Sequence, residues 1–149
     1  MQADQASAEG SSTSQPIDIV QAFLGALEAK EFERAVGYLA DDVVYQNVPL
    51  PADHGKPAVI RTLKSFERLV TGFEVKMVNI AARDGVVLTE RIDILKGPLV
   101  HMDLWVCGTF EVKNGKITLW RDYFDLATAA AKLVTGPFRK LLGRTGRSR

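Results

Sequence analysis

The sequence predicts an α+β domain in which N-terminal helices pack on a strongly curved, mixed β-sheet. Apolar residues recur at helical spacing in the first part of the chain, whereas from Phe73 onward they alternate with polar residues. Turn signals divide this second part into four antiparallel strands. Helices followed by a run of strands indicate an α+β fold. A strongly bent sheet with helices on its concave side encloses a cone-shaped pocket, which suits a small molecule.

Three helices are predicted ahead of the run of strands. The first covers 16–29, because Pro16 suits a first helical turn and apolar residues follow at helical spacing. The second is shorter and covers 31–39, with Leu39 among its inward residues. The third begins near Pro57 and again carries one apolar stripe.

The strands are predicted from their alternation and from the turns between them. Asn114-Gly115 is the strongest hairpin signal in the chain. A first strand at 43–48 runs into the proline-rich loop 49–55. The other strands are expected at 73–81, 86–95, 99–112 and 117–124. A terminal helix is expected to begin at Asp125, as its N-cap, and to end near Val134.

Residues 16–135 are expected to form one domain, because a chain of 149 residues can bury a core without disulfides. The segment 1–15 is rich in Gln, Ala, Ser and Glu, and we expect it to be disordered. The segment 136–149 is expected to be a basic, solvated tail. Such a tail can contact phosphates or anionic lipid, but it lacks the interleaved aromatic residues of a nucleic-acid site, so no nucleic-acid partner is expected.

Composition indicates an ordinary soluble protein, with 46% apolar and 25% charged residues. The single cysteine, Cys107, excludes an internal disulfide and fits a reducing compartment. No apolar run is long enough to span a membrane, and the N-terminus lacks the basic and apolar regions of a secretory signal. We therefore expect a cytoplasmic protein.

One strand combines charged residues with an apolar face. Residues two apart in a strand point the same way, so Arg91 and Asp93 share a face with Val87 and Leu95. A charged pair on such a face is costly unless it is satisfied, and Asp122 is the best candidate partner. Two carboxylates bridged by one guanidinium can hold one proton between them, which is equipment for acid–base chemistry.

Two further strands place polar groups on faces that otherwise look buried. Asp122 shares its face with Trp120 and Phe124, and Tyr45 shares its face with Asn47. Tyrosine and asparagine both donate and accept hydrogen bonds. Together with one carboxylate, Tyr45 and Asn47 can hold a water molecule by three hydrogen bonds.

Three segments that carry these residues, Tyr45–Pro51, Leu88–Leu95 and Trp120–Leu126, resemble the signature segments of the limonene-1,2-epoxide hydrolase family. The resemblance covers roughly 16–127. It implies the cone-shaped fold shared with nuclear transport factor 2 and ketosteroid isomerase, a homodimer, and no cofactor. The stretch 73–125 also resembles actinobacterial relatives associated with bulkier lipid or sterol epoxides.

The resemblance also implies an activity and a role for each residue. Water would be added to an apolar epoxide (terpene-like, cyclic or lipid) to give a vicinal diol, in one concerted step without a covalent intermediate. Asp93 would be the general acid, Asp122 the general base, and Arg91 would orient both. Tyr45 and Asn47 would hold the attacking water with Asp122.

Two other functions on the same fold stay open at this point: an isomerase or cyclase, and a non-catalytic protein that binds a small molecule. A metal is not expected, because His101 and Asp103 share a strand face without a third ligand at metal-like spacing. Cys107 is expected to be a small core residue, and Trp105 is expected in the core or in the pocket wall.

Overall fold

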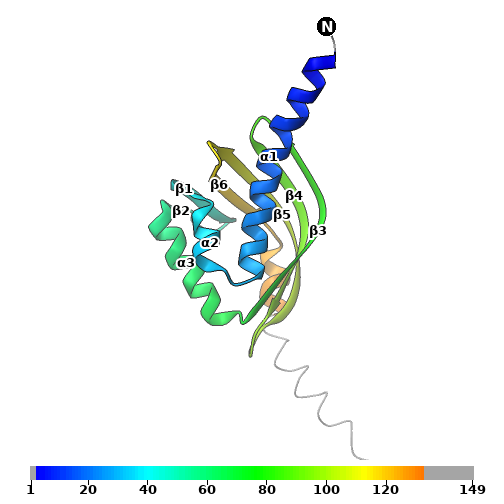
Figure 1. Ribbon diagram of the computed structural model, residues 1–149. Helices are drawn as coiled ribbons and strands as arrows, with labels where there is room; N and C mark the ends of the chain where they lie inside the picture. Colours follow the sequence, from blue (N-terminus) through cyan, green and yellow to red (C-terminus); the bar gives the residue numbers. More distant parts are fainter. Residues whose placement is uncertain (1–2, 133–149) are drawn as a thin grey trace, which may run out of the picture.

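The computed structural model describes residues 3–132 (Figure 1). In this range the chain forms helices α1 (Ala3–Glu28), α2 (Phe32–Gly37) and α3 (Lys56–Leu69), and residues 126–132 are helical as well. The strands are β1 (Leu39–Val48), β2 (Asp53–His54), β3 (Gly72–Arg83), β4 (Val86–Lys96), β5 (His101–Lys113) and β6 (Lys116–Tyr123).

The six strands form one curved sheet in the order β2-β1-β6-β5-β4-β3. β1 runs parallel to β6, and every other neighbouring pair is antiparallel. The predicted mixed sheet is therefore confirmed. β2 was not predicted; it occupies two residues of the expected proline-rich loop and extends the sheet beyond β1.

The helices lie on the concave side of the sheet (Figure 1). The core forms between them, where Phe23 of α1 meets Phe110 of β5 and Trp120 of β6 edge to face, with ring centroids 6.4 and 5.0 Å away. These aromatic contacts matter beyond stability, because Trp120 is also a neighbour of the polar groups described below.

The first two helices differ from their predicted bounds. α1 begins at Ala3 rather than at Pro16, so the expected disordered segment 1–15 is helical from Ala3 onward. Alanine, glutamine and glutamate in this segment favour a helix, and Pro16 lies inside it. α2 ends at Gly37, and Leu39 instead begins β1, fully buried.

The C-terminal end begins as expected. Both Ala127 and Thr128 donate their backbone N–H groups to Asp125 Oδ1, which caps the last helix. The predicted end of this helix near Val134 and the basic tail 136–149 lie outside the described residues.

Two expected core residues lie on the outer, convex face of the sheet. The inward side chains of β5 are those of Met102, Val106 and Phe110, so the odd-numbered residues point outward. Trp105 is 57% exposed and Cys107 is partly exposed. The predictions of a core position for Cys107 and of a core or pocket-wall position for Trp105 were wrong. β5 carries apolar residues on both faces, and alternation alone does not show which face is covered.

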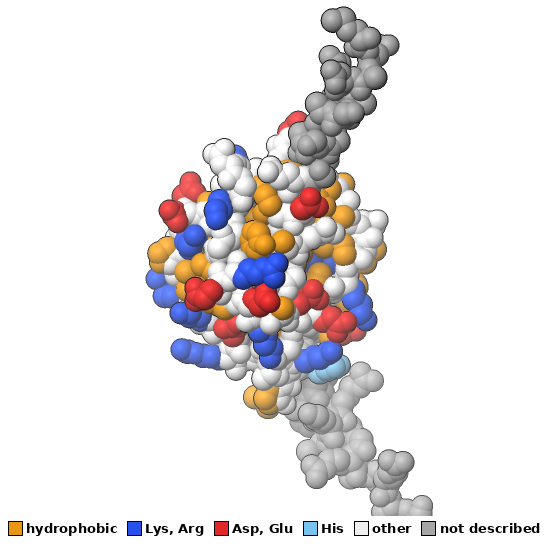
Figure 2. All heavy atoms as spheres, viewed as in Figure 1, with side chains coloured by type: hydrophobic (Ala, Val, Ile, Leu, Met, Phe, Trp, Pro, Cys, Tyr) orange, Lys and Arg blue, Asp and Glu red, His pale blue; other side chains and the backbone are white. Residues whose placement is uncertain are grey.

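On the face of the molecule seen in Figure 2, basic and acidic side chains are interspersed rather than gathered by sign. This face therefore offers no patch of one charge for a polyanion. Within residues 3–132, none of the helices combines the length and the hydropathy that a bilayer-spanning segment needs.

Candidate active site

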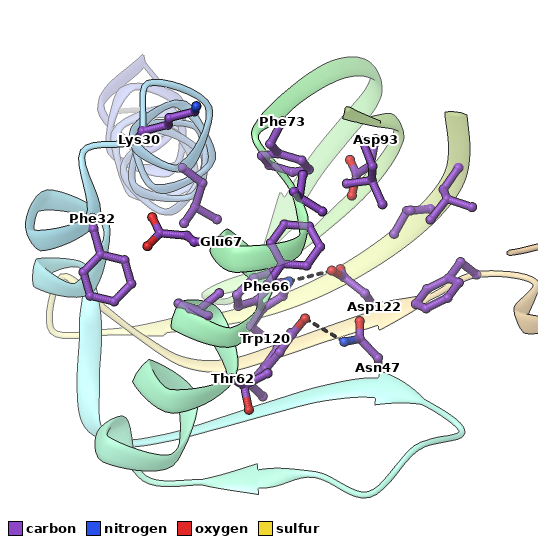
Figure 3. Close-up of a pocket in the computed structure, with 18 of the residues that line it drawn as sticks. Lys30, Phe32, Asn47, Thr62, Phe66, Glu67, Phe73, Asp93, Trp120 and Asp122 are labelled. Carbon is purple, nitrogen blue, oxygen red and sulfur yellow. Dashed lines mark hydrogen bonds between the residues drawn. The ribbon is translucent and has the colours of Figure 1, made fainter. Parts of the chain in front are cut away.

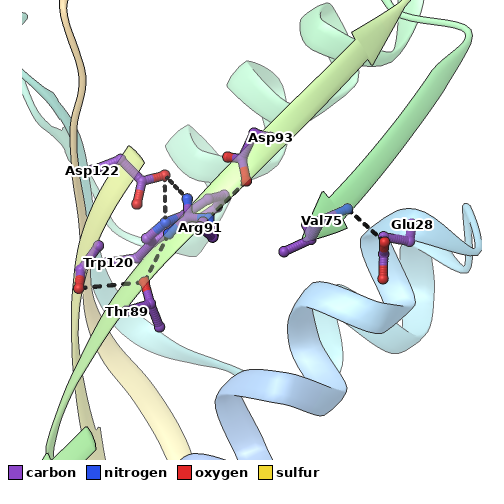
Figure 4. Close-up of polar contacts among 8 residues, drawn as sticks. Glu28, Val75, Thr89, Arg91, Asp93, Trp120 and Asp122 are labelled. Atoms are coloured by element: carbon purple, nitrogen blue, oxygen red, sulfur yellow. Dashed lines mark hydrogen bonds and ion pairs between the residues drawn. The ribbon is translucent and has the colours of Figure 1, made fainter. Parts of the chain in front are cut away.

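A buried arginine, Arg91 of β4, stands at the centre of the site. Its side chain is 1% exposed. Its Nε donates to Asp93 Oδ1 at 2.9 Å and its Nη2 donates to Asp122 Oδ2 at 2.7 Å (Figure 4). The expected partner, Asp122 on β6, is therefore confirmed. Burying this guanidinium is tolerable because two carboxylates surround it.

Thr89 and Phe110 complete the surroundings of the guanidinium. Arg91 Nη1 donates to Thr89 Oγ1 at 3.0 Å, and Arg91 Cζ lies 6.0 Å from the ring centroid of Phe110. Sequence reasoning missed Thr89. The signal was available, because Thr89 lies two residues before Arg91 and hence on the same face of β4.

Gly108 of β5 makes room for this cluster, and sequence reasoning missed it too. It lies opposite both Thr89 of β4 and Asp122 of β6. A Cβ at this position would overlap Arg91 Nη1 and would lie 2.9 Å from Asp122 Oδ1. Glycine in a strand interior marks a close approach of other groups, and here the close group is the guanidinium.

Asp122 is almost fully buried and uses its two oxygens differently. Oδ2 accepts from Arg91 Nη2 and from Trp120 Nε1, the latter at 2.9 Å. Oδ1 is buried and has no hydrogen-bond partner among the described residues. An unpaired buried carboxylate oxygen is costly, so Oδ1 is where a donor from outside the protein is most needed.

Tyr45 and Asn47 lie beside Asp122 because β1 is parallel to β6. Asn47 pairs with Asp122 and Tyr45 pairs with Trp120 across the two strands. Asn47 Nδ2 donates to the Tyr45 hydroxyl at 2.7 Å. Burial raises the pKa of the Tyr45 hydroxyl far above its ordinary value, so it stays neutral. The fold thus brings together all five residues singled out in the sequence.

These groups border a pocket of about 510 Å³ (Figure 3). Asn47, Asp93 and Asp122 lie at one end of it, and Lys30 and Phe32 lie towards the other. Most of the lining is apolar and includes Leu63, Phe66, Phe73, Leu95, Leu104 and Val106. A mainly apolar lining with a few polar groups is typical of a site for a mainly apolar small molecule.

The electrostatics favour one shared proton on the two carboxylates. Burial raises the pKa of Asp93 to about 6, although Arg91 opposes the rise. Burial also raises the pKa of Asp122, against the opposing effects of Arg91 and Trp120. One guanidinium balances one carboxylate charge, so the buried cluster is neutral when the pair retains one proton. The two acids are expected to titrate as a coupled unit.

The other polar residues considered in the sequence lie elsewhere. Arg121, Asp125 and Glu90 point away from the site; Arg121 binds Gln46, and Glu90 accepts from Asn79 and Trp105. His101 and Asp103 are exposed. Among the described residues, no three His, Cys, Asp or Glu side chains come together as a metal ion would require.

Three comparisons with known proteins agree on one family. The model of the limonene-1,2-epoxide hydrolase catalytic domain matches residues 14–134. The chain is 44% identical over 118 residues to epoxide hydrolase EphG of Mycobacterium tuberculosis, a match that covers 78% of each chain. A solved structure of an M. tuberculosis LEH-like epoxide hydrolase has a TM-score of 0.75 and 39% identity, covering 92% of this chain and 99% of that one.

More distant structures share the fold alone. A putative polyketide cyclase from Xanthomonas campestris pv. campestris has a TM-score of 0.74 at 20% identity, covering 80% of this chain and 97% of that chain. The expected cone-shaped α+β fold is thereby confirmed.

The substitution Gly108→Ala is expected to destabilise the protein, because the added methyl group must displace the Arg91 guanidinium or the backbone. Overpacking of this kind costs roughly 1 to 3 kcal/mol. Gly25→Ala is the matched control: a Cβ there meets nothing within 4 Å, and alanine favours the helix. Urea unfolding measures both. Equal stabilities of Gly108→Ala and the wild type would show that the cluster tolerates a side chain at this position.

Proposed function

The chain belongs to the limonene-1,2-epoxide hydrolase family, and we propose that it adds water to an apolar epoxide to give a vicinal diol in one concerted step. One observation carries this proposal. A single buried guanidinium binds the carboxylates of both Asp93 and Asp122 at one end of a mainly apolar pocket.

We assign the general base to Asp122. Two N–H donors on Oδ2, one of them charged, favour its ionised form. Oδ1, which has no hydrogen-bond partner within residues 3–132, is available to accept a hydrogen bond from water. Asn47 and Tyr45, bonded to each other on the neighbouring strand, supply the further contacts that orient this water. The water is then held with one hydrogen directed at the base.

We assign the general acid to Asp93. It lines the pocket, Arg91 donates to only one of its oxygens, and its pKa is raised to about 6 by burial. Asp93 accepts from one donor and Asp122 from two, so we assign the one proton of the pair to Asp93. Arg91 orients both carboxylates and prevents the cluster from carrying an uncompensated charge.

The reaction needs acid and base together because an alkoxide is a poor leaving group. Water loses a proton to Asp122 while its oxygen bonds to an epoxide carbon. The C–O bond to that carbon breaks, and the epoxide oxygen takes the proton of Asp93. The carboxylates end with their protonation states exchanged, and transfer of one proton from Asp122 to Asp93 restores the starting state. No step in this scheme requires a cofactor.

The wall of the pocket supports an apolar epoxide as substrate. A volume of about 510 Å³ with aromatic and aliphatic lining accommodates a terpene-like or other cyclic epoxide, or part of a lipid epoxide. The apolar body would pack against Phe66 and Phe73, with the epoxide ring between the two aspartates.

The two other functions considered from the sequence, an isomerase or cyclase and a non-catalytic binding protein, fit the site and the family less well. Isomerase chemistry usually combines one carboxylate base with a neutral oxyanion donor. The cationic guanidinium that is bonded to both aspartates here is not part of that arrangement. A binding protein would not need Tyr45, Asn47 and three charged residues at one end of its pocket.

We also propose a homodimer that forms through the convex face of the sheet. Leu88 is 55% exposed, Trp105 57% and Tyr123 40%, and all three lie on neighbouring strands of this face with Ile92 and Cys107. Large exposed apolar residues gathered on one face are typical of an interface. Glu90 lies among them, and its carboxylate is already satisfied by Asn79 and Trp105.

Asp122→Asn and Asp93→Asn are each expected to lower kcat for epoxide hydrolysis by roughly 10² to 10⁴, the usual contribution of a positioned acid or base. Tyr45→Phe is expected to cost about 3-fold to 10-fold, because it removes one neutral hydrogen bond. Arg121→Gln, next to Asp122 but on the other face of β6, is the matched control and should retain full activity. Full activity of Asp122→Asn would refute the assignment of the base.

The pH dependence of kcat/KM is expected to be bell-shaped. Below the bell Asp122 becomes protonated and cannot act as base, and above it Asp93 loses the proton that the epoxide oxygen needs. Because the folded pKa of Asp93 is raised to about 6, the alkaline limb should be centred near pH 6, above the range of an ordinary carboxyl group. A rate that does not fall between pH 5 and 9 would contradict the role of Asp93.

Leu88→Glu is expected to convert the dimer to a monomer, since it buries a charge in the proposed interface. Light scattering coupled to size-exclusion chromatography measures the mass. Leu69→Glu, at an exposed residue of α3, is the control and should stay dimeric. A monomeric wild type, or a dimeric Leu88→Glu variant, would refute this interface.

A further inference from the structure

Glu28, the last residue of α1, makes a contact that the proposed chemistry does not explain. Its Oε1 accepts a hydrogen bond from the backbone N–H of Val75 at 2.6 Å (Figure 4). Val75 belongs to β3, the edge strand of the sheet, where every second N–H lacks a strand partner. The carboxylate of Glu28 thus fills a vacant position on the edge of β3 and ties the end of α1 to it.

The position of this contact along β3 relates Glu28 to the acid. Val75 is the residue that pairs with Asp93 in the register of β3 and β4. Residues directly opposite each other in an antiparallel pair have Cβ atoms about 4.5 to 5.5 Å apart. The Glu28 carboxylate is therefore held on the backbone of the immediate cross-strand neighbour of Asp93.

Few charges act on Asp93 from the elements around it. Its cross-strand neighbours, Val75 on β3 and Leu104 on β5, do not titrate. The titratable and charged groups that face it or line the same pocket are Arg91 of β4, Asp122 of β6, Tyr45 of β1, Glu67 of α3, Lys30 after α1, and Glu28 itself. Glu28 forms no ion pair with any described residue, so no direct contact neutralises its charge.

We propose that Glu28 is a positioning residue for the general acid: fixed on the Val75 amide, its negative charge favours the protonated form of Asp93. This proposal rests on the proposed function, in which Asp93 is the acid. The charge of Arg91 favours the ionised form of Asp93. The carboxylate of Glu28, which is bonded to β3 on the side of β4 opposite to Asp122, offsets this effect.

The electrostatic balance at Asp93 supports this role. Burial is the main cause of its raised pKa, Arg91 opposes it, and the charges of Asp122 and Glu28 both add to the rise. Removal of the Glu28 charge should therefore lower the pKa of Asp93. The alkaline limb of the pH–rate profile would then move to lower pH, because Asp93 would lose its proton earlier.

Glu28→Gln separates charge from structure, because glutamine keeps an oxygen that can accept from the Val75 N–H. The titration of the Asp93 carboxyl carbon is followed by NMR in the wild type and the variant, with the signal assigned by Asp93→Asn. We expect the midpoint to fall by roughly 0.5 unit, the effect of one partly screened charge. Asp18→Asn, which removes an exposed carboxylate from the same helix, is the control and should not move it.

Glu28→Ala removes both the charge and the hydrogen bond. It should lower the midpoint as Glu28→Gln does and, unlike Glu28→Gln, lower the thermal stability. The titration needs only one of the two variants, Glu28→Gln or Glu28→Ala, to be folded. An unchanged Asp93 midpoint in a folded variant, or an equal shift in Asp18→Asn, would refute the role of Glu28.

The NMR titration does not depend on turnover, so the two proposals can fail separately. Absence of epoxide hydrolysis by the wild type with a shifted Asp93 midpoint in Glu28→Gln would refute the function and leave the Glu28–Asp93 coupling standing. If both proposals hold, the alkaline limb of the pH profile of kcat/KM should shift in Glu28→Gln by the same amount as the NMR midpoint of Asp93.

Discussion

The burial of Arg91 is the constraint on which the rest of the site depends. A guanidinium taken out of water needs compensating charge and hydrogen bonds, and its side chain is 1% exposed. Asp93, Asp122 and Thr89 supply them. Two carboxylates around one guanidinium would leave one uncompensated negative charge in an apolar pocket, and a single retained proton removes it. The stability of the cluster and its capacity for acid–base chemistry thus have the same physical origin.

The topology of the sheet assembles these groups from distant parts of the chain. The parallel pairing of β1 with β6 places Asn47 next to Asp122, and the antiparallel β4–β5–β6 run aligns Thr89, Gly108 and Asp122 in one row. The aromatic core under β6 fixes Trp120, whose Nε1 then holds Asp122. Packing in the hydrophobic core therefore helps to fix the position of the proposed base, because Trp120 belongs to the core and also donates a hydrogen bond to Asp122.

Much of the site was predictable because side chains two residues apart in a strand lie on the same face. That rule, with three motif-like segments, identified the five polar residues. It did not identify Gly108 or Glu28, whose importance lies in a close approach and in a backbone contact across 47 residues of sequence. It misplaced Trp105 and Cys107, because a strand that is apolar on both faces does not reveal which one the helices cover.

The most direct test of the central claim is a single turnover in oxygen-18 water, with the protein in excess over an apolar cyclic epoxide such as limonene-1,2-epoxide. Mass analysis of the diol and of the protein then locates the label. Direct attack by a water activated at Asp122 predicts one labelled oxygen in the diol and none in the protein. Label in the carboxylate of Asp93 or Asp122 would show a covalent ester intermediate and contradict the concerted acid–base scheme.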